Sequence, residues 1–191
     1  MPSAPGRLLA LPAMRRTALL LVGVLALVFG TTACGGGGGG DKSFDAEGIG
    51  VTFKYPSSFK PIKNFTFAQS AGAKARARGG VSVDSANAII VSRYDLKIAI
   101  TKANLAGVKG EADNVISQLA GKRVSGREVD YGGLPGYEYA ISLTKPANGL
   151  SRLVVLFDRA TEYLLNCQST PSKRNKVEDA CRKALDTLGR K

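Results

Sequence analysis

The chain has 191 residues, 27 lysines and arginines against 15 acidic residues, a formal net charge of +12 and no histidine. The absence of histidine removes the commonest general base, the usual Ser-His-Asp triads and most zinc sites, and so argues against most hydrolases and metalloenzymes. The length suffices for one domain with a hydrophobic core of its own.

Residues 1–33 have the composition of an export signal. Their only charged residues are Arg7, Arg15 and Arg16, and residues 17–30 (TALLLVGVLALVFG) form an uncharged, largely apolar run. A basic start, a short apolar centre and small residues at the end are typical of a secretory signal peptide. The run is shorter than the about 20 residues that a membrane-spanning helix needs. We therefore expect residues 1–33 to be removed on export.

Cys34 stands where cleavage is expected, directly after Thr31, Thr32 and Ala33. This arrangement resembles a bacterial lipobox, in which the cysteine sulfur carries a diacylglyceryl group and the signal is cut just before it. Ala33 fits that pattern and Thr32 is tolerable in it, whereas Thr31 replaces the usual aliphatic residue. The resemblance implies anchoring through lipid on Cys34 at the extracytoplasmic face of the cell membrane. The alternative is an incidental cysteine in an ordinary signal or anchor helix.

The initiator and the export route stay open. Met14 could start the chain in place of Met1, because Met14-Arg15-Arg16 would itself begin a compact signal. The Arg15-Arg16 pair allows twin-arginine export, but the residues that follow it match that signal poorly and favour the Sec route.

Residues 34–43 are interpreted as the lipidated cysteine and a tether. Six glycines, Gly35–Gly40, follow Cys34. Such a run forms a flexible coil with a root-mean-square reach of about 13 Å, which would hold a folded domain clear of the lipid headgroups. A phosphate-binding loop is the competing interpretation, but no strand precedes the run and no Gly-Lys-Ser or Gly-Lys-Thr follows it.

Residues 44–191 are expected to form one α+β domain. The stretch SFDAEGIGVTFKYP predicts a hairpin, and residues 105–119 place apolar side chains every three or four positions, as an amphipathic helix does. Further strands are predicted at residues 86–94, 123–131, 137–143, 150–157 and 161–169, with turns at 132–136 and 158–160, and a last helix from Pro171 to a capping Gly189. Because hairpins outnumber crossovers, we expect a single antiparallel sheet with helices packed on it.

Cys167 and Cys181 remain as a pair once Cys34 carries lipid. Alternation puts Cys167 on the apolar face of the predicted strand, and Cys181 lies on the apolar stripe of the last helix. Both therefore point into the layer between strand and helix. Oxidised cysteines persist in exported proteins, and a bridge closing a loop of about 15 residues would add about 3 kcal/mol. Two buried free thiols are the alternative.

The mature chain would stay basic, with 24 lysines and arginines against 15 acidic residues and a net charge of +9. One of its basic groups lies in residues 71–80 (AGAKARARGG), which we interpret as a mobile loop. For an exported protein the expected partners are anionic lipid, acidic cell-wall polymer or an unknown envelope protein, and not nucleic acid. A solvated basic surface is the plainer interpretation.

Aromatic residues are concentrated near the start of the domain: Phe44, Phe53, Tyr55, Phe59, Phe65 and Phe67. Core packing is the plainer explanation, because alternate residues of a hairpin must face the core. The sharper alternative is a partly open aromatic groove beside the basic loop, which would suit an amphiphile with an anionic head. The candidate ligand-binding residues of such a groove are Phe53, Tyr55, Phe59, Phe65, Lys74, Arg76 and Arg78.

Three stretches together resemble actinobacterial lipoproteins of the PsbP/Mog-like superfamily: VTFKYPSSF, the Gly-Leu-Pro-Gly sequence at Gly133–Gly136, and YLLNCQ followed by ACRKALDTL. The resemblance covers about residues 44–189 and implies a sheet sandwiched by helices. Members include photosystem accessory subunits, a small-GTPase-binding protein and surface lipoproteins. Since these roles are unrelated, the fold implies no particular one.

Motifs for catalysis are weak. Ser57-Ser58-Phe59-Lys60 matches Ser-x-x-Lys, but no Lys-Thr-Gly is present, and turn residues are the plainer interpretation. No metal-binding spacing and no cofactor motif stand out. We expect a non-enzymatic binding or accessory module that acts through protein or envelope contacts. The alternative is a carrier or sensor of a lipid-like or anionic amphiphilic small molecule.

Overall fold

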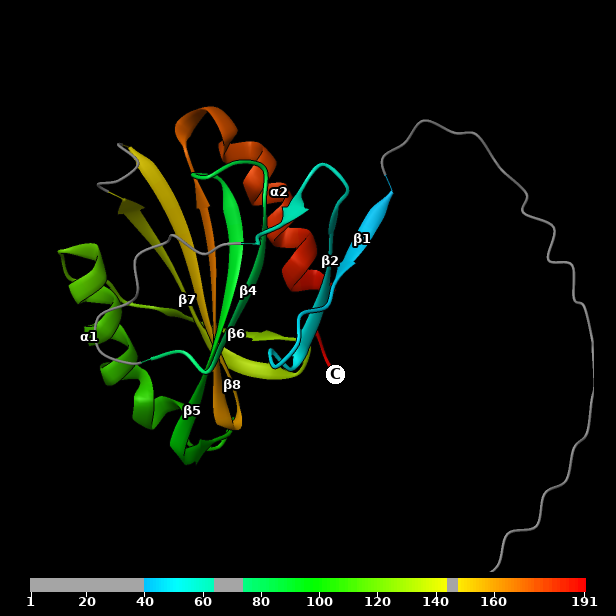
Figure 1. Cartoon of the computed structure of the whole chain (residues 1–191). Helices are drawn as coiled ribbons and strands as arrows, with labels where there is room; N and C mark the ends of the chain where they lie inside the picture. Colours follow the sequence, from blue (N-terminus) through cyan, green and yellow to red (C-terminus); the bar gives the residue numbers. More distant parts are fainter. Residues whose placement is uncertain (1–39, 64–73, 144–147) are drawn as a thin grey trace, which may run out of the picture. The chain divides into compact units, whose positions relative to one another are not determined.

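The computed structural model describes residues 40–63, 74–143 and 148–191. The predicted signal, Cys34 and most of the glycine tether lie outside the described residues. The chain runs through β1 (Asp41–Phe44), β2 (Val51–Pro56), β3 (Lys60–Pro61), β4 (Ala77–Ser82), β5 (Ala88–Ile100), α1 (Lys109–Ala120), β6 (Arg127–Tyr131), β7 (Leu134–Leu143), β8 (Gly149–Ser169), α2 (Arg174–Asp186) and β9 (Gly189–Arg190) (Figure 1). Short 3-10 helices, Leu105–Val108 and Pro171–Lys173, precede α1 and α2.

The α+β class is confirmed, but the expected single sheet is wrong. A six-stranded sheet has the order β3-β4-β5-β8-β7-β6, and β1, β2 and β9 form a second, three-stranded sheet. All the pairings between strands are antiparallel. The β1–β2 hairpin is present as predicted, with Phe44 opposite Phe53, but β2 pairs with β9 instead of joining the large sheet. Alternation predicts strands without predicting which strands pair.

β8 folds back on itself. Its first half pairs with β7 and its second half with β5. The Ser151 hydroxyl donates to Oδ1 of Asn166 at 2.7 Å, although a straight strand would separate these residues by about 50 Å. Arg159, between them, has a φ of 54°, as a tight turn requires. The two strands predicted at 150–157 and 161–169 and the turn between them are therefore present, and together they make up β8.

Three glycine-based predictions need correction. The turn predicted over residues 132–136 is only two residues long, Gly132-Gly133, and Leu134 already pairs with Tyr131. Gly136 lies within β7, and glycine is needed there because a Cβ would clash with the Val155 carbonyl oxygen. Gly189 does not cap the last helix. It lies in β9, where it pairs with Thr52 of β2.

The basic loop expected at residues 71–80 is strand from Ala77 onward, because β4 spans Ala77–Ser82. Its glycines permit close packing instead of mobility: a Cβ on Gly80 would lie 2.5 Å from the carbonyl oxygen of Ile89 on β5. Likewise, β1 begins at Asp41, so part of the stretch assigned to the tether belongs to the fold.

Two cores lie on opposite faces of the large sheet. The first joins α2 and the small sheet to the large sheet, with Phe53, Leu165 and Leu185 among its buried side chains. The predicted disulfide is present there and links Cys167 of β8 to Cys181 of α2, with 6.0 Å between their Cα atoms. The second core lies under α1 and contains Tyr137, Leu153 and Phe157 among others. The domain is thus a sheet with a covered face on each side (Figure 1).

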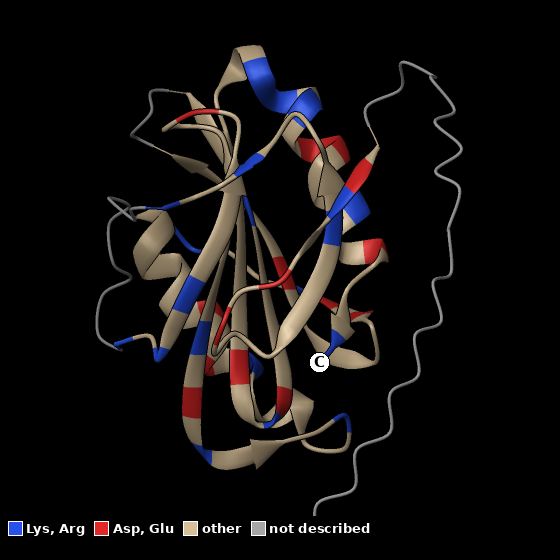
Figure 2. Ribbon diagram, turned by 45° about the vertical axis from the view of Figure 1, so that its right-hand side comes forward, with Lys and Arg blue, Asp and Glu red and all other residues tan. Residues whose placement is uncertain are grey.

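Exposed basic residues gather at the start of α2, where Figure 2 shows Lys and Arg in blue. Lys173, Arg174 and Lys176 are all exposed there. No ion pair involving them is present among the described residues. This part of the surface is basic and exposed.

Candidate binding cleft

α1 is attached to the sheet along one edge. Ile116, in the middle of the helix, is buried, and so is Leu105 in the 3-10 turn that leads into it. The Tyr137 hydroxyl, on β7, donates to the Leu105 carbonyl oxygen at 2.9 Å. This edge therefore has both apolar and hydrogen-bonded contacts with the sheet.

Asp113 holds the same edge in place by several hydrogen bonds. Its Oδ1 accepts from the Gly126 backbone N–H at 2.9 Å and from the Tyr139 hydroxyl at 3.0 Å. Its Oδ2 accepts from Lys109 Nζ at 2.7 Å and from the Ser125 hydroxyl at 3.0 Å. Burial alone would raise the pKa of Asp113, but these bonds outweigh it and lower the pKa to about 2. The ionised carboxylate therefore joins α1, the loop after it and β7.

The other edge of α1 is uncovered. The predicted stripe of Leu105, Val108, Ala112, Val115 and Leu119 forms as expected, yet Val115 is 43% exposed and Leu119 40% exposed. An apolar stripe of this kind normally packs against the core. Here the stripe turns from buried to open along the helix.

The end of β5 faces this open edge. Its pairing with β8 is interrupted between Asp95 and Ile100, and Ile98, within the interruption, is 60% exposed. Ile98, Val115 and Leu119 are the large hydrophobic side chains that are exposed in the described part of the chain. All three line one cleft.

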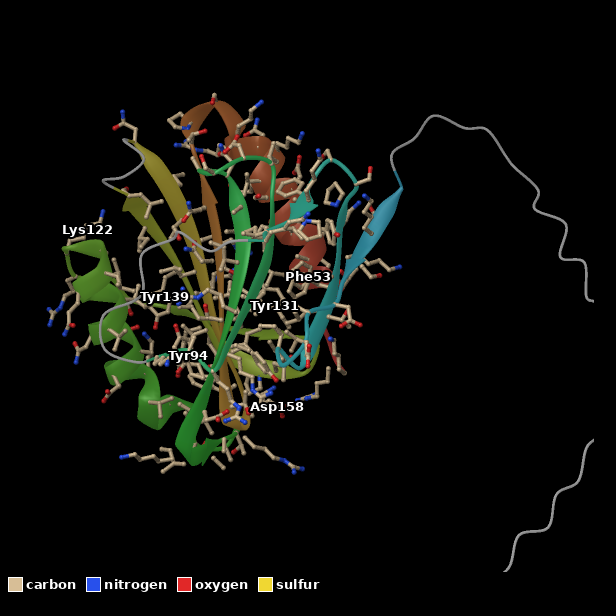
Figure 3. The ribbon with its side chains drawn as sticks, in the orientation of Figure 1. Phe53, Tyr94, Lys122, Tyr131, Tyr139 and Asp158 are labelled. Carbon is tan, nitrogen blue, oxygen red and sulfur yellow. A yellow bond between two sulfur atoms is a disulfide. The ribbon has the colours of Figure 1, made fainter. Side chains whose placement is uncertain are left out.

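The cleft has a volume of about 570 Å³ and lies between α1, the end of β5 and the middle of β8, on either side of the turn at Arg159. Val155, Phe157 and Leu164 come from β8, and Leu96 and Ile100 come from β5. Figure 3 places Tyr94 and Tyr139 between α1 and the sheet, and Phe53 and Tyr131 on the other side of the sheet. Most of the lining is apolar, so the cleft is suited to an apolar guest.

Four of the described residues that line the cleft are charged: Asp95, Lys97, Glu111 and Glu162. Asp95 pairs with Arg76 at 3.2 Å and with Arg93 at 3.7 Å. Glu162 is half-buried and has no hydrogen-bond or ion-pair partner among the described residues. Burial raises the pKa of its carboxyl group. Glu162 is therefore a partly buried carboxyl group in the cleft whose loss of water is not offset by a hydrogen bond or an ion pair within the described residues.

The aromatic groove proposed from the sequence lies elsewhere and is closed. Phe53, Tyr55 and Phe59 are 1%, 4% and 0% exposed and belong to the core under α2. Phe53 stacks on Phe44 with 4.5 Å between the ring centroids. These three rings serve the core, which was the plainer explanation; Phe65 lies outside the described residues.

The predicted basic residues are not gathered into a binding site. Lys74 is exposed, and Arg78 donates from Nε to the Ser92 hydroxyl at 3.2 Å. Arg76 reaches Asp95 at the edge of the cleft. Of these three basic residues, the structure therefore brings only Arg76 to the cleft beside α1.

Sequence reasoning missed the cleft, although one signal was available. Leu164 is a large apolar residue in a row of β8 that otherwise holds Glu162, Asn166 and Gln168. An apolar residue in a polar row indicates that this part of the outer face is covered or lines a site.

A second, smaller hollow of about 280 Å³ lies beside the disulfide. It contains Glu138 and Arg152, joined at 2.8 Å, and the Tyr131 hydroxyl donates to Glu138 at 2.8 Å. These groups form one ion-paired cluster, in which Arg152 Nε is buried without a hydrogen-bond partner among the described residues. Asn87, which is buried, likewise has a structural role, since its Oδ1 accepts from the Thr170 N–H at 2.8 Å.

Among residues 40–63, 74–143 and 148–191, no three His, Cys, Asp or Glu residues gather in a way that could hold a metal ion. Within the same ranges no helix has the length and apolar character needed to cross a membrane.

No protein-family model matches the sequence, and no curated protein matches it. Solved structures do. Cyanobacterial PsbP (CyanoP) from Synechocystis sp. PCC 6803 superposes with a TM-score of 0.53 at 12% identity, over 84% of this chain and 99% of that one. The domain has the PsbP/Mog-like fold.

Two further structures are similar to this PsbP/Mog-like domain. A protein of Bacteroides thetaiotaomicron VPI-5482 has a TM-score of 0.51 at 12% identity, over 78% of this chain and 48% of the other, so this chain spans about half its length. LpqN of Mycobacterium tuberculosis, described as involved in cell envelope biogenesis, has a TM-score of 0.47 at 15% identity, over 78% of this chain and 90% of that one. At such identities the likeness shows the fold alone.

Proposed function

We propose that this protein is a non-enzymatic binding module, anchored outside the cytoplasmic membrane through lipid on Cys34, and that it holds an apolar small molecule in the cleft beside α1. Of the two functions that the sequence left open, the cleft favours the carrier or sensor. The observation that carries this proposal is the gathering of Ile98, Val115 and Leu119 around one cavity.

The size and lining of the cleft support a small-molecule ligand. Ligand sites in proteins are clefts of about 300–1,000 Å³ with mostly apolar walls and a few placed polar groups. The cleft has about 570 Å³, a floor of Val155, Phe157 and Leu164, and one uncompensated carboxyl group at Glu162. Exposed large apolar side chains cost free energy in water, and a ligand that covers them recovers it.

The anchor rests on the sequence pattern around Cys34. A basic start, a short apolar run, small residues and then cysteine are what lipid attachment requires. The glycines that follow would let the domain reorient next to the membrane.

The cleft is tested with a pair of matched double variants on α1. Val115→Ser/Leu119→Ser makes the open edge polar, whereas Asn114→Ser/Gln118→Ser changes two exposed residues of the same helix that do not line the cleft. We expect the first to abolish binding of an apolar fluorescent probe and the second to retain it. Equal probe binding by both variants would refute the site.

The anchor is tested by mass spectrometry of protein extracted gently from membranes. We expect a chain that begins at Cys34 and carries acyl groups, and we expect Cys34→Ala to release the protein from the membrane. An unlipidated mass with residues before Cys34 retained would refute the anchor. An adduct lost only on denaturation would identify the ligand.

A further inference from the structure

The charge of the cleft is opposite in sign to that of the chain. The whole sequence carries +12, with 27 basic residues against 15 acidic ones. Among the residues that the structure describes, the charged residues lining the cleft are three carboxylates (Asp95, Glu111 and Glu162) and Lys97. A basic protein that concentrates acidic groups around a large apolar opening has a charge pattern suited to a cation.

These carboxylates differ in what they are free to bind. Asp95 is engaged by Arg76 and Arg93, and so is neutralised by the protein itself. Glu111 is exposed on α1, where water solvates it, and Lys97 is exposed on β5. Glu162 is half-buried and has no partner in the described part of the chain.

Glu162 is placed to meet a ligand that lies on the apolar floor. It stands on the same face of β8 as Leu164, and it is opposite Tyr94 of β5 in the sheet register. A half-buried carboxylate without a hydrogen-bond donor is costly in free energy, and a positively charged donor recovers that cost best.

We propose that the ligand of this cleft is an amphiphile with an apolar body and a cationic, hydrogen-bond-donating head such as a protonated amine, with the body against Val115, Leu119 and Phe157 and the head at Glu162. This inference rests on the proposed function and assigns the class of ligand that the cleft selects. The charge of this ligand is opposite to that of the anionic amphiphile which the sequence suggested beside the basic loop.

Anionic and neutral headgroups fit the cleft less well than a cationic one. An anionic head would lie close to Glu162 and Glu111, and like charges repel most strongly where water is partly excluded. A neutral hydroxyl could donate one hydrogen bond to Glu162, but it would leave the negative charge of the carboxylate without an opposite charge beside it.

The test compares three probes that share a dodecyl chain and differ in the head: dodecylammonium, dodecanol and dodecanoate. Each is titrated calorimetrically into the full mature chain below its micelle concentration. We expect dodecylammonium to bind about tenfold more tightly than dodecanol, and dodecanoate to bind weakest.

Glu162→Gln removes the charge and keeps the size of the side chain. We expect it to weaken dodecylammonium binding about tenfold, to the level of dodecanol, and to leave dodecanol binding unchanged. Glu47→Gln serves as the matched control: it removes the same charge, and Glu47 is exposed in the β1–β2 turn and does not line the cleft. A cooperative unfolding transition at a temperature no lower than that of the natural protein shows that each variant has folded.

The outcomes separate this inference from the proposed function. If dodecanoate binds best, or if Glu162→Gln and Glu47→Gln weaken dodecylammonium equally, the cationic ligand is refuted while the apolar site stands. If none of the three probes binds, and Val115→Ser/Leu119→Ser changes nothing, the proposed function itself is refuted.

Discussion

The two helices cover opposite faces of the same sheet in different ways. α2 buries Val177, Ala180, Cys181, Ala184 and Leu185 and is joined covalently to β8. α1 buries only Ile116 and is held largely by the hydrogen bonds of Asp113. The face under α2 is therefore closed, and the face under α1 is open along one edge.

The difference shows how a small domain can separate stability from binding. The α2 face has the more extensive apolar core and also the cross-link, and both stabilise the fold. Hydrogen bonds at Asp113 orient α1 without covering Val115 and Leu119, because they act at one edge of the helix only. The open edge is then available to a ligand at little cost to the fold.

The largest expected effect compares one leucine from each helix. Leu185→Ala on α2 removes a side chain that is 1% exposed, and we expect a loss of about 3 kcal/mol in the free energy of unfolding. Leu119→Ala on α1, 40% exposed, should cost well under about 1 kcal/mol. Denaturant titration measures both. Similar losses for the two variants would mean that α1 is as closely packed as α2.

Removing the disulfide tests the closed face in a second way. We expect Cys167→Ala/Cys181→Ala to lower the free energy of unfolding by about 3 kcal/mol, because the unfolded chain regains the freedom of a loop of 14 residues. Reduction of the natural protein with dithiothreitol should reproduce most of this loss. The probe affinity of the cleft should not change, since the bridge lies on the other face.

Asp113→Asn tests the attachment of α1. The lowered pKa means that the folded state prefers the ionised carboxylate, which contributes stability above about pH 4 that is lost as the pH falls towards 2. We expect the variant to lose about 1–2 kcal/mol at neutral pH, allowing for solvent screening at this partly exposed site. The difference from the natural protein should shrink as the pH falls from 4 to 2, which thermal unfolding at several pH values can follow. A constant difference would assign the effect to something other than the charge.

The smallest expected effect on stability is that of Glu162→Gln, which should stabilise the folded state, whereas the preceding variants should destabilise it. Burial raises the pKa of Glu162, so the ionised carboxylate destabilises the folded state at neutral pH. The variant should unfold at a slightly higher temperature at pH 7, and the gain should disappear in acid, where Glu162 is protonated. A lower unfolding temperature at pH 7 would show that Glu162 has a stabilising partner and that the open face is less open than the cleft indicates.

Much of the fold followed from local patterns. The SFDAEGIGVTFKYP stretch forms the β1–β2 hairpin, and the three-and-four spacing from Leu105 to Leu119 forms the helical turns of α1 and its 3-10 start. The positions of Cys167 and Cys181 on apolar rows predicted their disulfide. Glycine misled the prediction at Gly80 and Gly136, where the missing side chain admits a neighbouring backbone instead of making a turn.

The sequence by itself determined which faces of each element are apolar, because strand and helix periods are properties of a few consecutive residues. Only the tertiary structure decided which of those faces would be covered. Phe53, Tyr55 and Phe59 looked suited to a groove and became core, because α2, far along the chain, packs into the same cluster. Val115 and Leu119 looked like core and became the wall of a cleft, because the described chain places nothing over them. Burial depends on contacts between distant segments, and no local period contains that information.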